Sequence, residues 1–139
     1  MNLERAIQIA VEAHAGVKDR GGKAYILHPL SVMMRVESDA EKIVAVLHDV
    51  IEDTDWTFDD LNEEGFSQEI IDALESVTKT SDEEDYNQFV LRAQKNEIGR
   101  KVKIADIKEN LDVTRLGHLT EKDTSRINKY KNVIRLLTE

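Results

Sequence analysis

The chain has 139 residues, a net charge of −9 and no cysteine. A chain of this length is expected to form one domain over residues 1–139, and the lack of cysteine excludes disulfides and thiolate metal sites. Lys and Arg form no basic stripe along the sequence, so a nucleic-acid partner is not expected.

The sequence shows no feature of a membrane protein. No apolar run approaches the ~20 residues that a membrane span requires, and the first residues lack the layout of a signal peptide. We therefore expect a soluble, cytoplasmic protein. Because acidic helical domains often dimerise, we do not assume a monomer and keep a homo-oligomer as an alternative.

Apolar residues recur at helical spacing along the chain, which has one proline and few aromatics. This pattern predicts an all-α fold, a single helical bundle of about six to eight helices. In chain order we expect helices at 3–14, at 29–37, one capped by Ser38 that carries 43–49, one at 58–64 capped by Thr57, one capped by Ser67, then helices at 86–96 and 97–115, and a last one that starts with a capping box at Thr120.

Residues 16–24 lie between the first two helices and contain three glycines and three basic residues. Paired glycines permit unusual backbone angles, so a flexible basic loop is expected here. The Tyr25-Ile-Leu-His28-Pro29 segment follows. Since proline restricts the residue before it and favours a first helical turn, we expect His28 just before a helix.

A run of apolar residues from Ile43 to Leu47 leads directly into His48-Asp49 and then Glu52-Asp53. A helix that is apolar on nearly every side is buried, and buried imidazole and carboxylate groups must be paired or bound to a cation. Carboxylates are also unfavourable near the negative end of a helix dipole. A bound metal ion explains this pattern better than acids that face water.

The candidate metal ligands are His28, His48, Asp49 and Asp106. Two neutral imidazoles and two carboxylates suit Mn, Fe or Zn better than Mg. Asp106 has an ordinary alternative, a surface ion pair with Lys103 three residues earlier on the same helical face.

Three ordered motifs resemble those of the HD-domain metal-dependent phosphohydrolases of the RelA/SpoT type, and in particular the small stand-alone alarmone hydrolases. They are Tyr25-x-x-His28-Pro29, His48-Asp49-x-x-Glu52-Asp53-Thr54 and Lys103-x-Ala105-Asp106-x-x-x-Asn110. The resemblance covers most of the chain, from about Ala10 to Leu116.

The resemblance implies an all-α HD domain that binds a divalent metal, typically Mn²⁺, through His28, His48, Asp49 and Asp106. Glu52 and Asp53 would position or activate the attacking water, and Asn110 would contact the substrate. The implied reaction removes pyrophosphate from the 3′ position of guanosine tetra- or pentaphosphate, an anionic nucleotide. No synthetase domain of the long bifunctional enzymes is expected, because no sequence remains for it.

The sequence departs from the family on the side of the substrate. Asp19-Arg20 stands where the alarmone hydrolases usually have Arg-Lys, so Lys18, Arg20 or Lys23 would have to meet the pyrophosphate. The family's Asp-Arg-Leu-His-Asn stretch is Asp106-Ile-Lys-Glu-Asn110 here. Two alternatives therefore stay open: a phosphatase acting on another nucleotide or phosphorylated cofactor, and a non-catalytic helical module that binds a nucleotide.

Other residues favour ordinary roles. We expect His14 to be a hydrogen-bonded core histidine, Trp56 to pack on the core and Tyr130 to be a core aromatic. Lys108 and Arg115 are expected on the solvated surface, with phosphate contact as the alternative.

Overall fold

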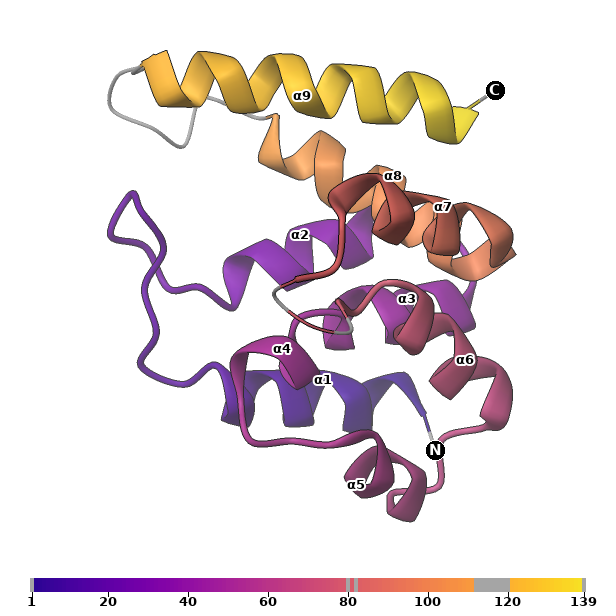
Figure 1. Cartoon of the computed structure of the whole chain (residues 1–139). Helices are drawn as coiled ribbons and strands as arrows, with labels where there is room; N and C mark the ends of the chain where they lie inside the picture. Colours follow the sequence, from indigo (N-terminus) through magenta and orange to yellow (C-terminus); the bar gives the residue numbers. More distant parts are fainter. Residues whose placement is uncertain (1, 80, 82, 112–120, 139) are drawn as a thin grey trace.

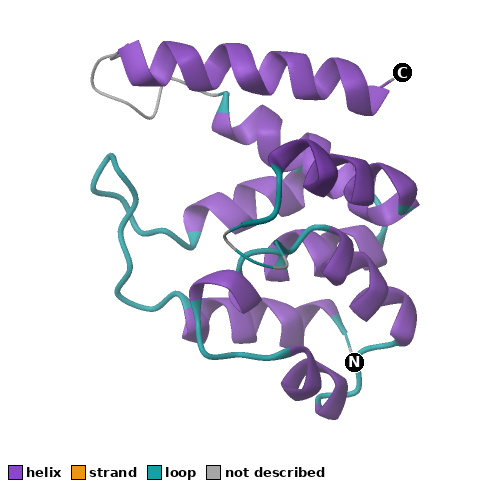
Figure 2. Cartoon of the chain, in the orientation of Figure 1, coloured by secondary structure: helices purple, strands orange, loops and turns teal. Residues whose placement is uncertain are grey.

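A computed structural model describes residues 2–79, 81, 83–111 and 121–138. The predicted all-α fold is confirmed: the described residues form eight helices and one single helical turn, and none of them lies in a strand longer than an isolated bridge. Figure 2 shows the helices joined by loops, of which the one between the first two helices is the most extended.

The elements follow one another along the chain in this order (Figure 1): α1 (Leu3–Ala13), α2 (Leu27–Met34), α3 (Asp39–Leu47), the turn α4 (Val50–Asp53), α5 (Phe58–Glu63), α6 (Gln68–Ser76), α7 (Tyr86–Lys95), α8 (Glu97–Asn110) and α9 (Glu121–Thr138). Helix α9 covers one side of the bundle, while α1 and α5 lie on the opposite side. The helices between them form the layers that carry the site.

Helix α3 is the centre of the bundle. It packs against α1, α2, α6 and α8, and every residue from Ile43 to Leu47 is buried. A helix of this kind has no polar face, which is what the apolar run predicts. The turn that follows α3 therefore starts from the middle of the core.

Side-chain caps fix the start of several helices. Ser38 accepts the backbone N–H of Glu41, whose carboxylate in turn reaches the backbone N–H of Ser38, so the two form a capping box at α3. Thr57 and Ser67 accept backbone N–H groups at the starts of α5 and α6. The caps predicted at Ser38, Thr57 and Ser67 are confirmed.

Several predicted helix bounds differ from the structure, most of them by one residue, and α2 ends at Met34 rather than at residue 37. Helix α2 starts at Leu27, not at Pro29, so His28 lies inside its first turn. Proline is accepted there because N–H groups in a first turn have no helical acceptor. Helix α8 ends at Asn110, and Leu111 is already a turn residue. The remainder of the predicted 97–115 helix, with Gly117 and Thr120, lies outside the described residues.

Helix α9 packs on α7 and α8 through a second apolar cluster, formed by Val90, Ile107, Val133 and Leu137. Helices α6 and α8 approach closely at Gly99, where an added Cβ would lie 2.0 Å from Ser76 Oγ. No helix in the described part of the chain is long and apolar enough to cross a membrane.

Candidate functional site

Three parts of the chain bring the four predicted metal ligands together. His28 lies in the first turn of α2, His48 and Asp49 lie in the turn between α3 and α4, and Asp106 lies on α8. Helices α2, α3 and α8 all pack against one another. Residues separated by up to 78 positions in the sequence therefore face a common point.

The ligand atoms are spaced as a single ion would require. His28 Nε2 and His48 Nε2 lie 2.9 and 3.4 Å from Asp106 Oδ1, and 3.9 and 3.1 Å from Asp49 Oδ2. Neighbouring ligand atoms in an octahedral site with bonds of about 2.1 Å are roughly 3 Å apart. His28, His48 and Asp49 together form a group that could hold a metal ion, and Asp106 joins it through both imidazoles.

The hydrogen bond at the other ring nitrogen of His48 fixes which atom faces this point. Its Nδ1 lies 2.5 Å from the carbonyl oxygen of Ala45, and since a carbonyl only accepts, Nδ1 carries the proton. In the neutral ring Nε2 then offers a lone pair. This atom is buried and makes no well-aligned hydrogen bond with any described residue. Such an arrangement fits a metal ligand.

The carboxylates and imidazoles control one another's charge. Burial lowers the pKa of His48, but the negative charges of Asp49 and Asp106 raise it well above the usual value. Burial raises the pKa of Asp106, but His48, the hydrogen bond from His28 and the Lys103 ammonium hold it well below the usual value. In the metal-free protein these interactions favour ionised carboxylates and the protonated form of His48.

Tyr25 orients Asp49, a role that the sequence reasoning missed. The Tyr25 hydroxyl donates a hydrogen bond to Asp49 Oδ2, the oxygen that also faces His48. Burial and the nearby charge of Asp49 raise the pKa of Tyr25, so the phenol keeps its proton. The Tyr-x-x-His-Pro motif was the available signal, since it places the phenol one helical turn before His28.

Two further residues of α8 contact Asp106. The amide of Asn110 donates to Asp106 Oδ1 at 3.4 Å, and the ammonium of Lys103 lies 3.7 Å from Asp106 Oδ2. The Lys103–Asp106 pair given as the alternative is therefore present, but it does not lie at the surface, because Lys103 is buried and the Asp106 side chain is only 13% exposed.

Glu52 and Asp53 take different positions. Asp53 lines the same cavity as Asp49, and burial together with the charges of Asp49 and Glu52 raises the pKa of Asp53 to about 6. Glu52 does not line this cavity and instead accepts the backbone N–H of Lys79 at 2.5 Å. The structure therefore separates the two members of the predicted water-activating pair.

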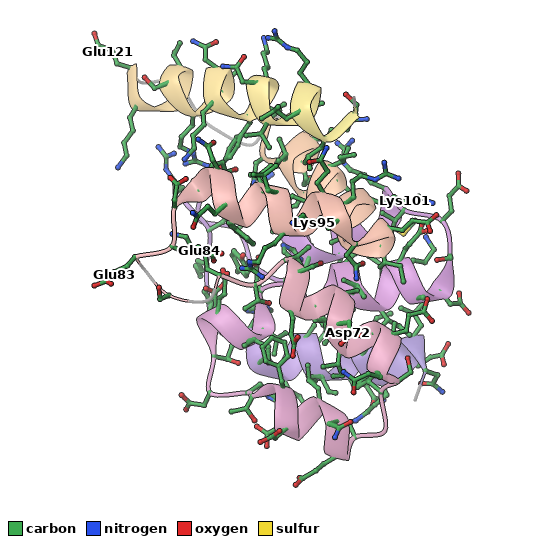
Figure 3. All side chains as sticks on the ribbon, turned by 45° about the vertical axis from the view of Figure 1, so that its right-hand side comes forward. Asp72, Glu83, Glu84, Lys95, Lys101 and Glu121 are labelled. Atoms are coloured by element: carbon green, nitrogen blue, oxygen red, sulfur yellow. The ribbon has the colours of Figure 1, made fainter. Side chains whose placement is uncertain are left out.

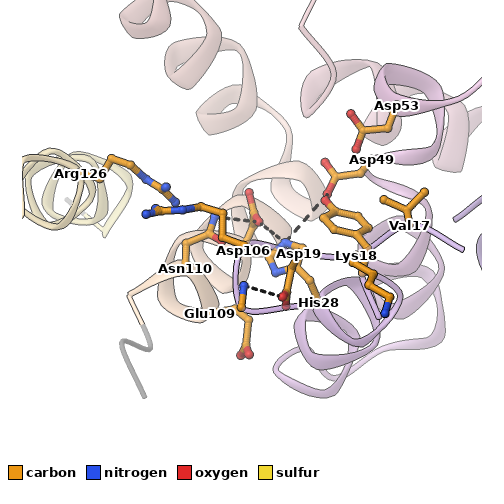
Figure 4. Close-up of a pocket in the computed structure, with 13 residues that line it drawn as sticks. Val17, Lys18, Asp19, His28, Asp49, Asp53, Asp106, Glu109, Asn110 and Arg126 are labelled. Atoms are coloured by element: carbon orange, nitrogen blue, oxygen red, sulfur yellow. Dashed lines mark hydrogen bonds and ion pairs between the residues drawn. The ribbon is translucent and has the colours of Figure 1, made fainter. Parts of the chain in front are cut away.

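A cavity of about 550 Å³ opens over the ligands (Figure 4). His28, Asp49 and Asp106 form its polar floor, and Figure 4 shows Asn110 and Arg126 on the side of α8 and α9. Arg126 was missed by the sequence reasoning, which found no motif in the last helix.

The basic loop supplies the other wall of this cavity. Lys18 and Arg20 line it, whereas Lys23 does not. Asp19 lines it too, and its Oδ1 accepts the backbone N–H groups of Gly21 and Lys23 at 2.9 and 3.0 Å. The carboxylate of Asp19 thus has a structural role, because it closes a turn in which Gly22 has a φ of +82°.

The remaining candidates have ordinary positions. His14 is buried as expected, but its Nε2 has no hydrogen-bond partner among the described residues, so the prediction of a hydrogen-bonded histidine is wrong at that atom. Trp56 and Tyr130 pack against the two apolar clusters. Lys108 is exposed and lines a different cavity. Arg115 lies outside the described residues.

Comparisons with known proteins identify relatives of the chain, although no family model matches it. A guanosine-3′,5′-bis(diphosphate) 3′-pyrophosphohydrolase of Aquifex aeolicus is 31% identical over 120 residues, which are 78% of this chain and 17% of that protein. A protein of the same name from Borreliella burgdorferi is 29% identical over 92% of this chain and 21% of its own length. The bifunctional (p)ppGpp synthase/hydrolase SpoT of Escherichia coli is 37% identical over 81 residues. The chain thus spans less than a quarter of the length of these relatives.

A solved structure has the same fold. It belongs to a metazoan ortholog of SpoT that hydrolyses ppGpp, and it superposes with a TM-score of 0.79 at 21% identity over 97% of this chain and 84% of that one. The relatives support the resemblance predicted from the three motifs, and the solved structure confirms the all-α fold.

Proposed function

We propose that this HD domain of the RelA/SpoT type is a metal-dependent phosphohydrolase that removes pyrophosphate from the 3′ position of guanosine tetra- or pentaphosphate, and so converts ppGpp to GDP and pyrophosphate. One observation carries the proposal: ligand atoms of His28, His48, Asp49 and Asp106 lie close together beneath a cavity whose lining includes Lys18, Arg20 and Arg126 besides the acidic residues Asp19, Asp53 and Glu109. The names of the relatives supply the substrate.

The cofactor is a divalent metal, and Mn²⁺ is the ion that we propose. Two imidazole nitrogens and two carboxylate oxygens favour Mn²⁺ over Mg²⁺. The two histidines, Asp49 and Asp106 would hold it. When bound, the ion would polarise the phosphoryl oxygen and promote ionisation of a water.

Glu52 and Asp53 have different roles in this proposal. Asp53 lines the cavity, and its raised pKa of about 6 suits a group that accepts a proton near neutral pH. Glu52 is held by the backbone of Lys79 at the edge of the site. We assign proton transfer to Asp53 and the positioning of α4, which carries Asp53, to Glu52.

Basic residues on two walls would bind the phosphates. Lys18 and Arg20 lie on the loop side and Arg126 on the α9 side, with Asn110 between them near the ligands. Lys23 lies outside the cavity lining, so in this proposal it contributes only if the loop closes on the substrate.

We propose that the domain acts as a single unit over residues 1–139 in the cytoplasm. Its partner is a small anionic nucleotide, and neither nucleic acid nor membrane is part of the proposal. A homo-oligomer is compatible with its acidic surface.

A second candidate keeps the chemistry and changes the substrate to another nucleotide or cofactor with a 3′- or 2′-phosphate. Asp19 favours it, because its carboxylate lines the cavity where a phosphate would enter. Against this, one oxygen of Asp19 is used by two backbone N–H groups of its own loop.

Product analysis of the Mn²⁺-loaded protein tests both candidates. The protein is incubated with ppGpp, NADPH and nucleoside monophosphates in separate reactions. Release of GDP and pyrophosphate from ppGpp supports the first candidate, and turnover of another nucleotide with ppGpp left intact supports the second.

The Asp49→Asn variant tests the metal site. It should lower turnover at least 100-fold because it removes a ligand charge. The matched control is Asp59→Asn, because Asp59 is an exposed aspartate of α5. Activity without added metal, or full activity in Asp49→Asn, would contradict the metal site.

A further inference from the structure

Lys103 is a buried cation that the chemistry described above does not use. Its residue is 8% exposed, and its ammonium lies 4.5 Å from the centre of the Phe89 ring and 5.8 Å from that of Tyr86. Aromatic faces attract a cation but do not replace its hydration. A buried ammonium is unfavourable unless a carboxylate is close to it.

Asp106 supplies the one carboxylate that lies within ion-pair distance of Lys103 in the described part of the chain, with Nζ 3.7 Å from Oδ2. The other oxygen of Asp106, Oδ1, faces His28 and His48. The two oxygens are thus divided between the metal site and Lys103. Because positions three apart share a helical face, this division fixes the rotamer of Asp106.

Lys103 is separated from the substrate. It does not line the cavity, whereas Lys18, Arg20 and Arg126 do. An ammonium placed behind a ligand does not touch the substrate, so it acts through that ligand or through its charge.

We infer that Lys103 is a positioning residue, clamped against Phe89, that holds the rear oxygen of Asp106 so that the front oxygen is presented to the metal ion. The inference rests on the proposed metal-dependent function. It deepens that function by adding a residue outside the predicted ligand set that controls metal affinity.

Two effects of the Lys103 charge oppose each other. A positive charge near the site repels a divalent cation, whereas orientation of Asp106 favours binding. The ammonium lies at the oxygen that faces away from the imidazoles, where the Asp106 charge offsets it. The orienting effect of Lys103 on Asp106 should therefore exceed the repulsion of the metal ion, and loss of the ammonium should weaken metal binding.

The test measures Mn²⁺ affinity without substrate, by the loss of the free-ion EPR signal during titration. Lys103→Met keeps the aliphatic stem against Phe89 and removes the charge. It should weaken Mn²⁺ binding about tenfold, the size usual for a residue that orients a metal ligand. Lys103→Arg keeps a cation over the ring and should recover at least half of this loss on a logarithmic scale. Lys101→Met is the matched control, because Lys101 lies on the same helix, pairs with Glu41 at 3.4 Å and has a 47% exposed side chain (Figure 3).

Each outcome has a defined meaning. Unchanged or tighter Mn²⁺ binding in folded Lys103→Met would overturn the inference, as would a failure of Lys103→Arg to recover any affinity. Absence of Mn²⁺ binding by the wild-type protein would overturn the metal site and this inference together. Weaker binding in Lys103→Met with no hydrolysis of ppGpp by the wild type would support the inference and reject the substrate.

Discussion

Single hydrogen bonds decide which atoms of the site face one another. Nδ1 of His48 donates to a backbone carbonyl, which leaves Nε2 for the metal, and the Tyr25 hydroxyl donates to Asp49 Oδ2. The first contact is local, three positions back along the chain, whereas the second joins residues that are 24 positions apart. Residues of this kind are commonly as important for metal affinity as the ligands are.

Tyr25→Phe tests whether the hydrogen bond from the Tyr25 hydroxyl to Asp49 supports metal binding. Loss of the hydroxyl frees Asp49 to rotate, so Mn²⁺ affinity should fall about tenfold. Titration calorimetry with Mn²⁺ measures the change. Tyr86→Phe is the control, because the Tyr86 hydroxyl is buried without a hydrogen-bond partner among the described residues and its removal should leave the affinity unchanged. An unchanged affinity in Tyr25→Phe would show that Asp49 needs no such support.

Sequence reasoning predicted a ligand set but not the residues that contact it, for a physical reason. His28, His48 and Asp49 lie in motifs whose residue types and spacing are specific. Lys103 was seen as a surface pair, since its burial depends on α7 packing over it. Arg126 reaches the cavity from a helix whose own pattern indicates only a core-facing stripe. Such roles depend on contacts between distant segments, which periodicity does not encode.

At the scale of elements, the segment after α6 positions Glu52. Arg92 of α7 donates to the carbonyl oxygens of Glu75 and Thr78 at 2.8 and 2.9 Å, and it also pairs with Glu84. The next residue, Lys79, donates its backbone N–H to Glu52. Helix α7 is therefore connected to α4 through this segment.

Arg92→Ala should release the segment and with it Glu52. We expect kcat to fall about tenfold, because Glu52 would no longer hold its position, while Mn²⁺ affinity stays within twofold since no ligand is touched. Steady-state kinetics and an Mn²⁺ titration of the same sample separate the two. Lys95→Ala, on an exposed position of the same helix (Figure 3), is the control. A loss of affinity as large as the loss of kcat would place Arg92 in support of the ligands instead.

Helix starts were predicted better than helix ends. Ser38, Thr57 and Ser67 mark starts because a side-chain oxygen there satisfies backbone N–H groups that the helix leaves free. No comparable signal stands at the end of α8, where the apolar spacing continues past Asn110 although the helix stops. Capping chemistry at a helix start can be read from a sequence, whereas apolar spacing alone does not mark where a helix ends.

At the scale of the whole molecule, the metal site joins distant parts of the fold. Its ligands come from α2, the turn after α3, and α8, which all pack on one another. An ion that binds only the folded arrangement stabilises it. The same ion must displace the proton that His48 holds in the metal-free protein, because only the neutral imidazole is a ligand.

Mn²⁺ should therefore stabilise the protein more at high pH than at low pH. The pKa of His48 is raised in the metal-free fold, so its proton stabilises that fold fully below the unfolded value of about 6.5, and this contribution is lost as pH rises through the folded pKa. Mn²⁺ at 100 times its Kd should add about 2.7 kcal/mol, which corresponds to roughly 8 °C in Tm. Thermal unfolding at about pH 6 and about pH 8, at one fixed Mn²⁺ concentration, should show a gap between loaded and EDTA-treated protein that widens with pH. Asp49→Asn should show almost no gap at either pH, and an equal gap at both pH values in the wild type would show that no proton is displaced from the site.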